Sequence, residues 1–238
     1  MKKQMILFAA LCMTAVASAQ TTATVDKALG TPSEKKALTE PIYKGANGLA
    51  FIGDARSSKE EGKEAGLNHE KATKYFKAAG KTIKAEAAVN FQKAPAGIAK
   101  KGQMSSSKAP YNRAVEFKPA GSGKLYALIW SKKPVGNIYY GVANNGVYEL
   151  KGSKQWEKGS TAGSESNPYE AVELDYEYQE GDVLFFFASG PLYMSGVYYT
   201  GAADAAFEGA TPKELVNAKK KARKPKQKKA AAADDDSE

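Results

Sequence analysis

Few side chains in this sequence could carry acid–base or metal chemistry. The chain has one histidine, His69, and one cysteine, Cys12. One imidazole cannot build a histidine-rich metal site. His69 also lies in the charged stretch GLNHEKATKYFK, where a surface histidine is expected rather than a member of a catalytic triad. These two residue types therefore give no basis for a metal centre or a nucleophilic site.

Aromatic residues in polar surroundings are better suited to bind a ligand. Sugars stack their CH groups on flat aromatic faces while neighbouring polar groups hold the hydroxyls. Trp156, in KGSKQWEKGS, is the best such residue; the alternative is that its ring covers one end of the core. Tyr139, Tyr140 and Tyr148 lie on a predicted hairpin, where adjacent tyrosines point to opposite faces, and cross-strand packing is their alternative role. We predict these four residues as the ligand-binding set.

The acidic residues are weaker candidates. Glu173, Asp175 and Glu177 alternate along YEAVELDYEY and could supply oxygen ligands to calcium, but alternating acids on a strand usually form a solvated face. We therefore predict no metal site and no cofactor. A polysaccharide lyase could use lysine, arginine or tyrosine as its base, yet no spacing indicates such a cluster, so we predict a protein that is not an enzyme.

The first residues have the pattern of a secretory signal peptide, predicted over 1–19. Lys2 and Lys3 precede an apolar run from Met5 to Val16, and Ala17-Ser18-Ala19 is a typical cleavage site. The run is too short to span a bilayer. We expect a secreted protein without a transmembrane segment, located in the periplasm, on the outer surface or outside the cell.

The elements that position the aromatic residues are predicted to be strands. Apolar residues recur at every second position over 83–91, which is typical of a strand with one dry face. The stretch NIYYGVANNGVYELKG predicts a β-hairpin that turns at Asn144-Asn145-Gly146. Residues 151–168 are predicted to be a loop, and a short helix is possible near 68–79, ending at Gly80. Further strands are predicted at 47–53, 114–119, 124–131, 169–178, 182–189 and 192–199.

This spacing of strands predicts an all-β fold, an antiparallel β-sandwich with jelly-roll topology. The stretch VLFFFA at 183–188 is predicted to lie in its core, as is Trp130 at the end of an apolar strand. We expect a flexible lead-in over 20–40, the sandwich domain over 41–203 and a disordered tail over 204–238. The tail is rich in lysine, and its candidate polyanion-binding residues are Lys219, Lys220, Lys221, Arg223 and Lys224; the alternative is a soluble tail without a specific partner.

The block that begins at Asn112 resembles a known module. Its segments NRAVEFKPAGSGKLYALIWSKK and VELDYEYQEGDVLFFFASGPLYMSGVYY are similar in strand rhythm to an accessory domain of secreted bacterial proteins, found beside pectate lyases and related polysaccharide-degrading enzymes. The resemblance covers residues 47–200 and implies a jelly roll like that of carbohydrate-binding modules. It implies no particular binding residue, and the catalytic neighbour of that arrangement does not accompany the module here.

These observations favour a secreted, non-catalytic protein that binds a polysaccharide or surface glycan. The alternative is a structural or protein-interaction component of the cell envelope, whose lysine-rich tail binds a polyanion.

Overall fold

The computed structural model describes eight stretches of the chain. They are 20–38, 43–52, 67–91, 114–131, 136–144, 147–156, 162–188 and 191–203. The predicted signal peptide, the turn residues Asn145 and Gly146, and the lysine-rich tail lie outside the described residues.

Two sheets make up the fold, and we call them sheet A and sheet B. Sheet A contains β1 (Gln20–Thr24), β2 (Lys36–Leu38), β5 (Leu67–Ala78), β6 (Lys81–Asn90), β9 (Leu125–Trp130), β12 (Tyr169–Glu170), β13 (Val172–Glu173) and β15 (Tyr193–Thr200). Sheet B contains β3 (Tyr43–Lys44), β4 (Leu49–Ile52), β7 (Ala114–Phe117), β10 (Asn137–Asn144), β11 (Val147–Gln155) and β14 (Leu184–Ala188). A separate pair joins β8 (Pro119–Ala120) to β16 (Ala202–Ala203), and α1 spans Val25–Leu29.

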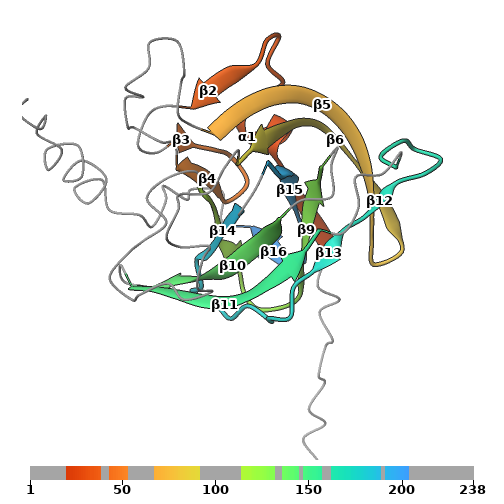
Figure 1. Cartoon of the computed structure of the whole chain (residues 1–238). Coiled ribbons are helices and arrows are strands. Elements are labelled where there is room, and N and C mark those ends of the chain that lie inside the picture. Colours follow the sequence, from red (N-terminus) through yellow and green to blue (C-terminus); the bar gives the residue numbers. More distant parts are fainter. Residues whose placement is uncertain are drawn as a thin grey trace, which may run out of the picture.

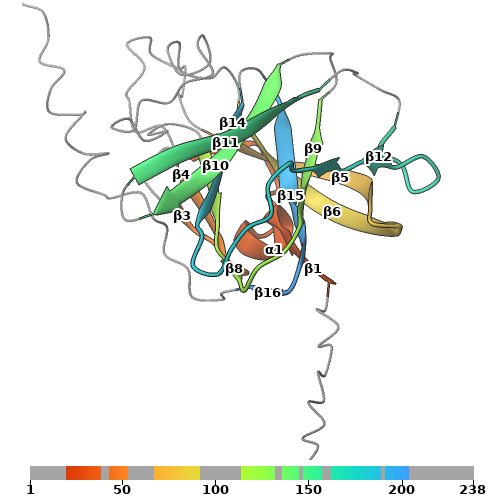
Figure 2. The ribbon, with the colours of Figure 1, turned by 90° about the horizontal axis from the view of Figure 1, so that it is seen from below.

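The strand order confirms the predicted antiparallel sandwich and gives its topology. Eight strands in chain order are β6, β7, β9, β10, β11, β13, β14 and β15. Sheet A places them as β6-β15-β9-β13, and sheet B as β7-β14-β10-β11. The first, eighth, third and sixth strands thus face the second, seventh, fourth and fifth, which is the double Greek-key order of a jelly roll. Figure 2 shows the two sheets side by side, with β4, β10 and β14 on the left and β5, β6, β9 and β15 on the right.

The main core lies between the sheets, and β14 shows how the sequence builds it. Leu184 and Phe186 are fully buried in the cluster between the sheets, whereas Phe185 and Phe187 belong to a second cluster on the outer face of sheet B. Alternate side chains point to opposite faces of a strand, so one continuous apolar run supplies both clusters. The prediction that this run is buried is confirmed.

The stretch 68–79 is a strand, so the possible helix predicted there is wrong. Its residues up to Ala78 belong to β5, which pairs with β6 except for a register shift between Lys71 and Lys74. Ala79 and Gly80, with φ of 46° and 77°, form the two-residue turn between the strands. From Glu70 onward burial alternates, with Phe76 and Ala78 buried and Lys77 exposed. Burial of these side chains against sheet neighbours outweighs the helix propensity of the lysines, alanines and glutamate.

The segment expected to be a flexible lead-in instead contributes β1, α1 and β2, so the described domain begins before residue 41. β15 pairs with β6 at Tyr193 and Met194, and then with β1 from Gly196 to Thr200. Since β9 occupies the other side of β15, β1 takes the place next to β15 that β6 leaves. The N-terminal strand therefore completes the sheet.

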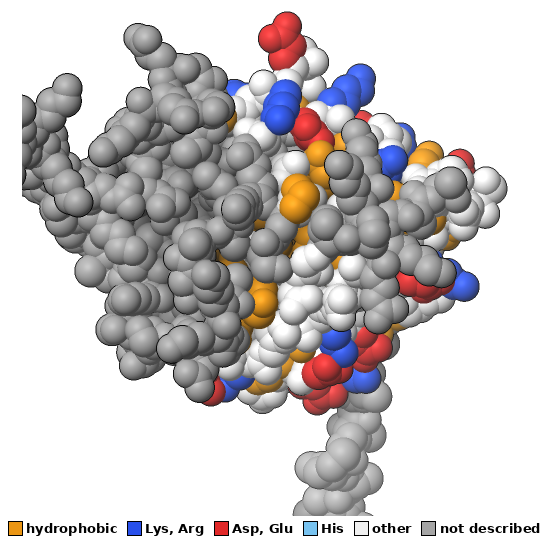
Figure 3. Space-filling view, viewed as in Figure 1, with side chains coloured by type: hydrophobic (Ala, Val, Ile, Leu, Met, Phe, Trp, Pro, Cys, Tyr) orange, Lys and Arg blue, Asp and Glu red, His pale blue; other side chains and the backbone are white. Residues whose placement is uncertain are grey.

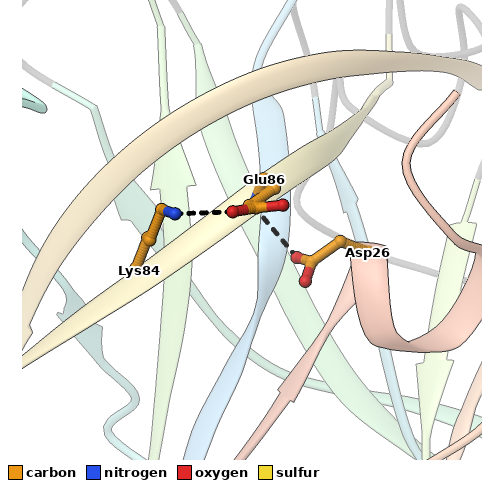
Figure 4. A network of polar contacts seen from close by, with 3 residues as sticks. All are labelled: Asp26, Lys84 and Glu86. Carbon is orange, nitrogen blue, oxygen red and sulfur yellow. Dashed lines mark hydrogen bonds and ion pairs between the residues drawn. The ribbon is translucent and has the colours of Figure 1, made fainter. Parts of the chain in front are cut away.

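Helix α1 contacts both β6 and β15, whose pairing with each other is limited to Tyr193 and Met194 of β15. The backbone N–H of Glu86 donates to Asp26 Oδ1 at 3.1 Å, and Lys84 pairs with the Glu86 carboxylate at 2.5 Å (Figure 4). The Asp26 carboxylate thus satisfies a β6 amide opposite the irregular pairing between Lys71 and Lys74 of β5. These contacts fasten the lead-in to the middle of sheet A.

Two further strand boundaries differ from prediction. Lys151–Gln155 extends β11 and is not part of the loop predicted over 151–168. The stretch 169–178 forms only the two-residue strands β12 and β13 and a bridge from Gly123 to Tyr178. Its alternation still holds, since Leu174 and Tyr178 are buried while Glu173 is exposed. Within the described stretches, no helix has the length and apolar character needed to cross a membrane.

Candidate functional site

A third apolar cluster lies on the outer face of sheet A. Its buried members come from the far half of the β5–β6 hairpin, from β9 and β15, and from β12; they are Phe76, Ala78, Ile83, Ala85, Ala88, Leu128, Trp130, Tyr169 and Tyr198. β5 is strongly arched (Figure 1), and the short segment 169–173 pairs with β5 at one end and with β9 at the other. The arched β5–β6 hairpin therefore comes close to β9 and encloses this third apolar cluster.

Four aromatic rings form a row through this cluster, which we call the aromatic row. Tyr193 stacks on Trp130 with ring centroids 4.0 Å apart and an interplanar angle of 11°. Trp130 lies 6.4 Å from Tyr169, and Trp156 meets Tyr169 edge-on at 5.7 Å. The middle rings, Trp130 and Tyr169, are 2% and 4% exposed, whereas Tyr193 and Trp156 at the two ends are only partly buried. The row thus reaches solvent at both ends.

Strand register places these rings. Trp130 and Tyr193 are direct partners between β9 and β15, and Tyr169 is brought to them by the pairing of β12 with Phe76 and Lys77 of β5. Trp156 follows directly after β11, where its backbone N–H donates to the Gly136 carbonyl at 3.1 Å. The row is therefore assembled from four separate parts of the chain.

Polar groups beside the row differ in how they are satisfied. Trp130 Nε1 donates to Ser195 Oγ at 3.2 Å, whereas Trp156 Nε1 is buried and has no hydrogen-bond partner among the described residues. The Tyr193 hydroxyl is hydrogen-bonded to Asn90 and Glu70. Burial first, and then the negative charge of Glu70, raise the pKa of Tyr193, so its hydroxyl stays protonated at neutral pH. The Trp156 indole N–H is thus closed off from solvent, although the residue as a whole is only partly buried.

A lysine lies over the middle of the row. Lys74 Nζ is 4.9 Å from the centroid of Trp130, within the range of a cation–π contact. Its stem runs past Gly163, where a Cβ would lie 3.0 Å from Lys74 Cδ and would also collide with the Tyr169 ring. The absence of a side chain at Gly163 lets the loop, the lysine stem and Tyr169 pack together.

The structure does not bring the four predicted ligand-binding residues together. Trp156 belongs to the aromatic row. Tyr140, 1% exposed, lies in the core between the sheets, where its hydroxyl accepts a hydrogen bond from the Asp175 backbone N–H at 3.1 Å. Tyr139, 7% exposed, lies on the outer face of sheet B and stacks on Phe187 at 5.0 Å. As expected, the two adjacent tyrosines take opposite faces; Tyr148 is in β11, but its side chain lies outside the description.

Two of the three acidic residues weighed for calcium form ion pairs with lysines. Glu173 pairs with Lys124 at 3.0 Å, and Asp175 pairs with Lys154 at 2.5 Å. In the part of the chain that the structure describes, no group of three or more His, Cys, Asp or Glu side chains is placed to hold a metal ion. Figure 3 shows acidic and basic side chains intermixed near the lower edge of the face in view, with hydrophobic side chains reaching the surface at several points.

His69 is buried in β5, so the expectation of a surface histidine is wrong. It is 5% exposed and lies opposite Val89 of β6 and Lys36 of β2. It is hydrogen-bonded to the backbone of Gly30, and its buried Nε2 has no partner in the described part of the chain. Burial lowers the pKa of His69, and the positive charge of Lys36 lowers it further. The neutral imidazole therefore joins β5 to the segment that links α1 and β2.

Acidification is expected to weaken the fold through His69. Because its folded pKa lies below the ordinary value of 6.5, the unfolded chain binds the proton more readily. The contribution of neutral His69 to the free energy of unfolding is complete above pH 6.5, and it is lost as the pH falls below 6.5 toward the folded pKa. Urea unfolding at a series of pH values, with His69→Gln beside the wild type, measures it: the wild type should lose more stability between pH 7.5 and 5. Parallel pH profiles for the two proteins would contradict this role.

No protein-family model matches this chain, and no curated protein sequence matches it either.

Proposed function

We propose that this protein is a secreted, non-catalytic jelly-roll protein that binds a glycan at the aromatic row. One observation carries the proposal: Trp156, at an end of the row, is only partly buried, so part of this residue remains accessible to a ligand. Its indole Nε1 is itself buried, so the ligand would meet the ring and not the N–H. A pyranose ring can pack on such an aromatic face.

The remainder of the row supports the same kind of ligand. Tyr193 presents a partly exposed ring held flat against Trp130, and its hydroxyl is fixed by Glu70 and Asn90. A rigid aromatic surface costs little conformational entropy when it binds. Because two buried rings separate the two partly exposed ends, the arrangement suits an oligosaccharide that spans several sugar units better than a single sugar.

The N-terminal strand is compatible with the predicted cleavage. β1 (Gln20–Thr24) lies after Ala19, the last residue of the predicted signal peptide. Removal of residues 1–19 would therefore leave every described element intact, including the strand that completes sheet A. N-terminal sequencing of the exported protein tests this part of the proposal.

Glycan binding is tested with Trp156→Ala. On a glycan array, and then by titration calorimetry with the best ligand, the variant should bind more weakly by at least about tenfold, because an aromatic ring on which the sugar packs is lost. Trp156→Phe should retain part of the affinity, since it keeps an aromatic ring. Gln155→Ala, at the exposed neighbouring position, is the matched control and should bind like the wild type. The proposal fails if the wild type binds no glycan, or if folded Trp156→Ala binds with unchanged affinity.

A further inference from the structure

We infer that the ligand of the aromatic row is an acidic glycan, whose carboxylate or sulfate pairs with Lys74. This inference rests on the proposed function and adds the chemical class of the ligand. It assigns Lys74 the role of the charged contact between the two exposed aromatic ends.

Lys74 is held in place rather than extended into solvent. It is partly buried, its stem packs beside Gly163 and Tyr169, and its ammonium lies 4.9 Å over the Trp130 ring. The backbone N–H of the next residue, Tyr75, donates to the Gly163 carbonyl at 3.2 Å, which fixes the loop against β5 at this point. The position of the charge is therefore set before a ligand arrives, and little side-chain entropy remains to be lost on binding.

Among the residues that the structure describes, no carboxylate pairs with Lys74. Within the described stretches, Lys74 forms no ion pair, whereas four other lysines each pair with an acid; these are Lys84, Lys124, Lys151 and Lys154. A cation that is partly removed from water and faces an aromatic ring gains strongly from an added anion, because both solvation and screening are reduced there. The structure thus leaves one fixed positive charge beside the surface on which sugars would stack.

The surroundings favour an acidic sugar over a nucleic acid. Glu70 lies on the same strand as Lys74 and is hydrogen-bonded to Tyr193. Glu165 and Glu170 are exposed on the segment beside β5. A continuous phosphate backbone would meet these negative charges as well as Lys74, whereas nucleic-acid sites carry a continuous basic surface. A glycan with spaced acidic groups can place one of them at Lys74 and neutral hydroxyls near Glu70.

The test uses two matched pairs of oligosaccharides with the full mature protein. Hexagalacturonate is compared with its methyl ester, and a sulfated galactan hexasaccharide with its desulfated form, by titration calorimetry. We expect at least about tenfold tighter binding of the charged member in one pair, and weakening of that binding as salt rises. Which pair responds distinguishes a carboxylate from a sulfate.

Variants at Lys74 then test whether this lysine causes the preference for the charged oligosaccharide. Lys74→Met keeps most of the stem over Trp130 but removes the charge, so it should bind charged and neutral members alike; Lys74→Arg should keep the preference. Lys71→Met, at an exposed position of the same strand, is the control and should not change it. Equal binding of both members in both pairs, or a preference that survives in Lys74→Met, overturns the inference and leaves glycan binding standing. No binding to any of the four sugars also overturns it, and an empty glycan array removes the proposed function as well.

Discussion

Replacing Phe186 with alanine is expected to lower the free energy of unfolding by about 3–5 kcal/mol, the usual cost of a Phe→Ala change in a close-packed core. Phe186 is fully buried between the sheets and lies between Tyr140 of β10 and Val115 of β7 in the strand register. Neighbours on paired strands cannot collapse into the space without breaking sheet hydrogen bonds, so most of the cavity should persist. Because domains of this size are stable by only about 5–15 kcal/mol, the variant should be close to unfolding at moderate temperature.

Urea unfolding followed by tryptophan fluorescence measures this loss. Phe186→Leu is the control, since it keeps most of the apolar volume and should cost much less. A Phe186→Ala protein that is destabilised by less than about 1 kcal/mol would mean that the ring does not fill the core, because surface substitutions usually cost no more than that.

The parts of the fold that were predictable from the sequence are those with a local signal. Residues 83–90 form a strand as their alternation predicts, but the single dry face expected there is wrong. Ile83 and Ala85 belong to the cluster on the outer face of sheet A, Val89 belongs to the core between the sheets, and Ala88 is buried as well. The hairpin of β10 and β11 forms where the Asn-Gly pair predicts it, with Asn144 opposite Val147. In both cases neighbouring residues alone determine the outcome, because strand period and turn geometry are short-range properties.

The errors occur where distant partners decide the structure. The stretch 68–79 has good helix formers, but its pairing with β6 and the burial of Phe76 determine its conformation. The lead-in shows no period over its length, yet β1 forms because β15 offers it an unoccupied edge. Neither partner can be recognised from the segment itself.

The candidate site was predictable only in part for the same reason. Trp156 was recognisable because a large aromatic residue in a polar stretch is unusual. Tyr193 and Trp130 carry no such signal, since each lies in an apolar strand of the type that usually fills a core. Their stacking follows from the register of β9 with β15, and the position of Lys74 over the row follows from the arch of β5. Alternation in a sequence predicts the face of the strand on which a side chain lies, but it does not predict which strand will pair beside it.

The docking of the N-terminal strand leads to the second large expected effect, which arises at Gly196. β1 runs directly against this residue: a Cβ there would collide with the Ala23 carbonyl oxygen and lie 2.7 Å from Thr24 Cα. Gly196 also has φ of 145°, a conformation that other residues rarely adopt, beside the irregular pairing between Met194 and Gly196. A side chain at this position would therefore force β1 away from β15, together with α1, which follows it directly in the chain.

Gly196→Ala is accordingly expected to destabilise the protein by about 2–4 kcal/mol, from overpacking against backbone added to conformational strain. Gly181→Ala separates the two causes, because Gly181 also has a positive φ, 89°, but its Cβ would meet nothing within 4 Å; this control should lose only about 1 kcal/mol. Hydrogen exchange gives the specific readout, since the amides of residues 20–24 should lose protection in Gly196→Ala and keep it in Gly181→Ala. Equal losses of stability in the two variants, with β1 amides still protected in both, would show that β1 does not depend on close approach at Gly196.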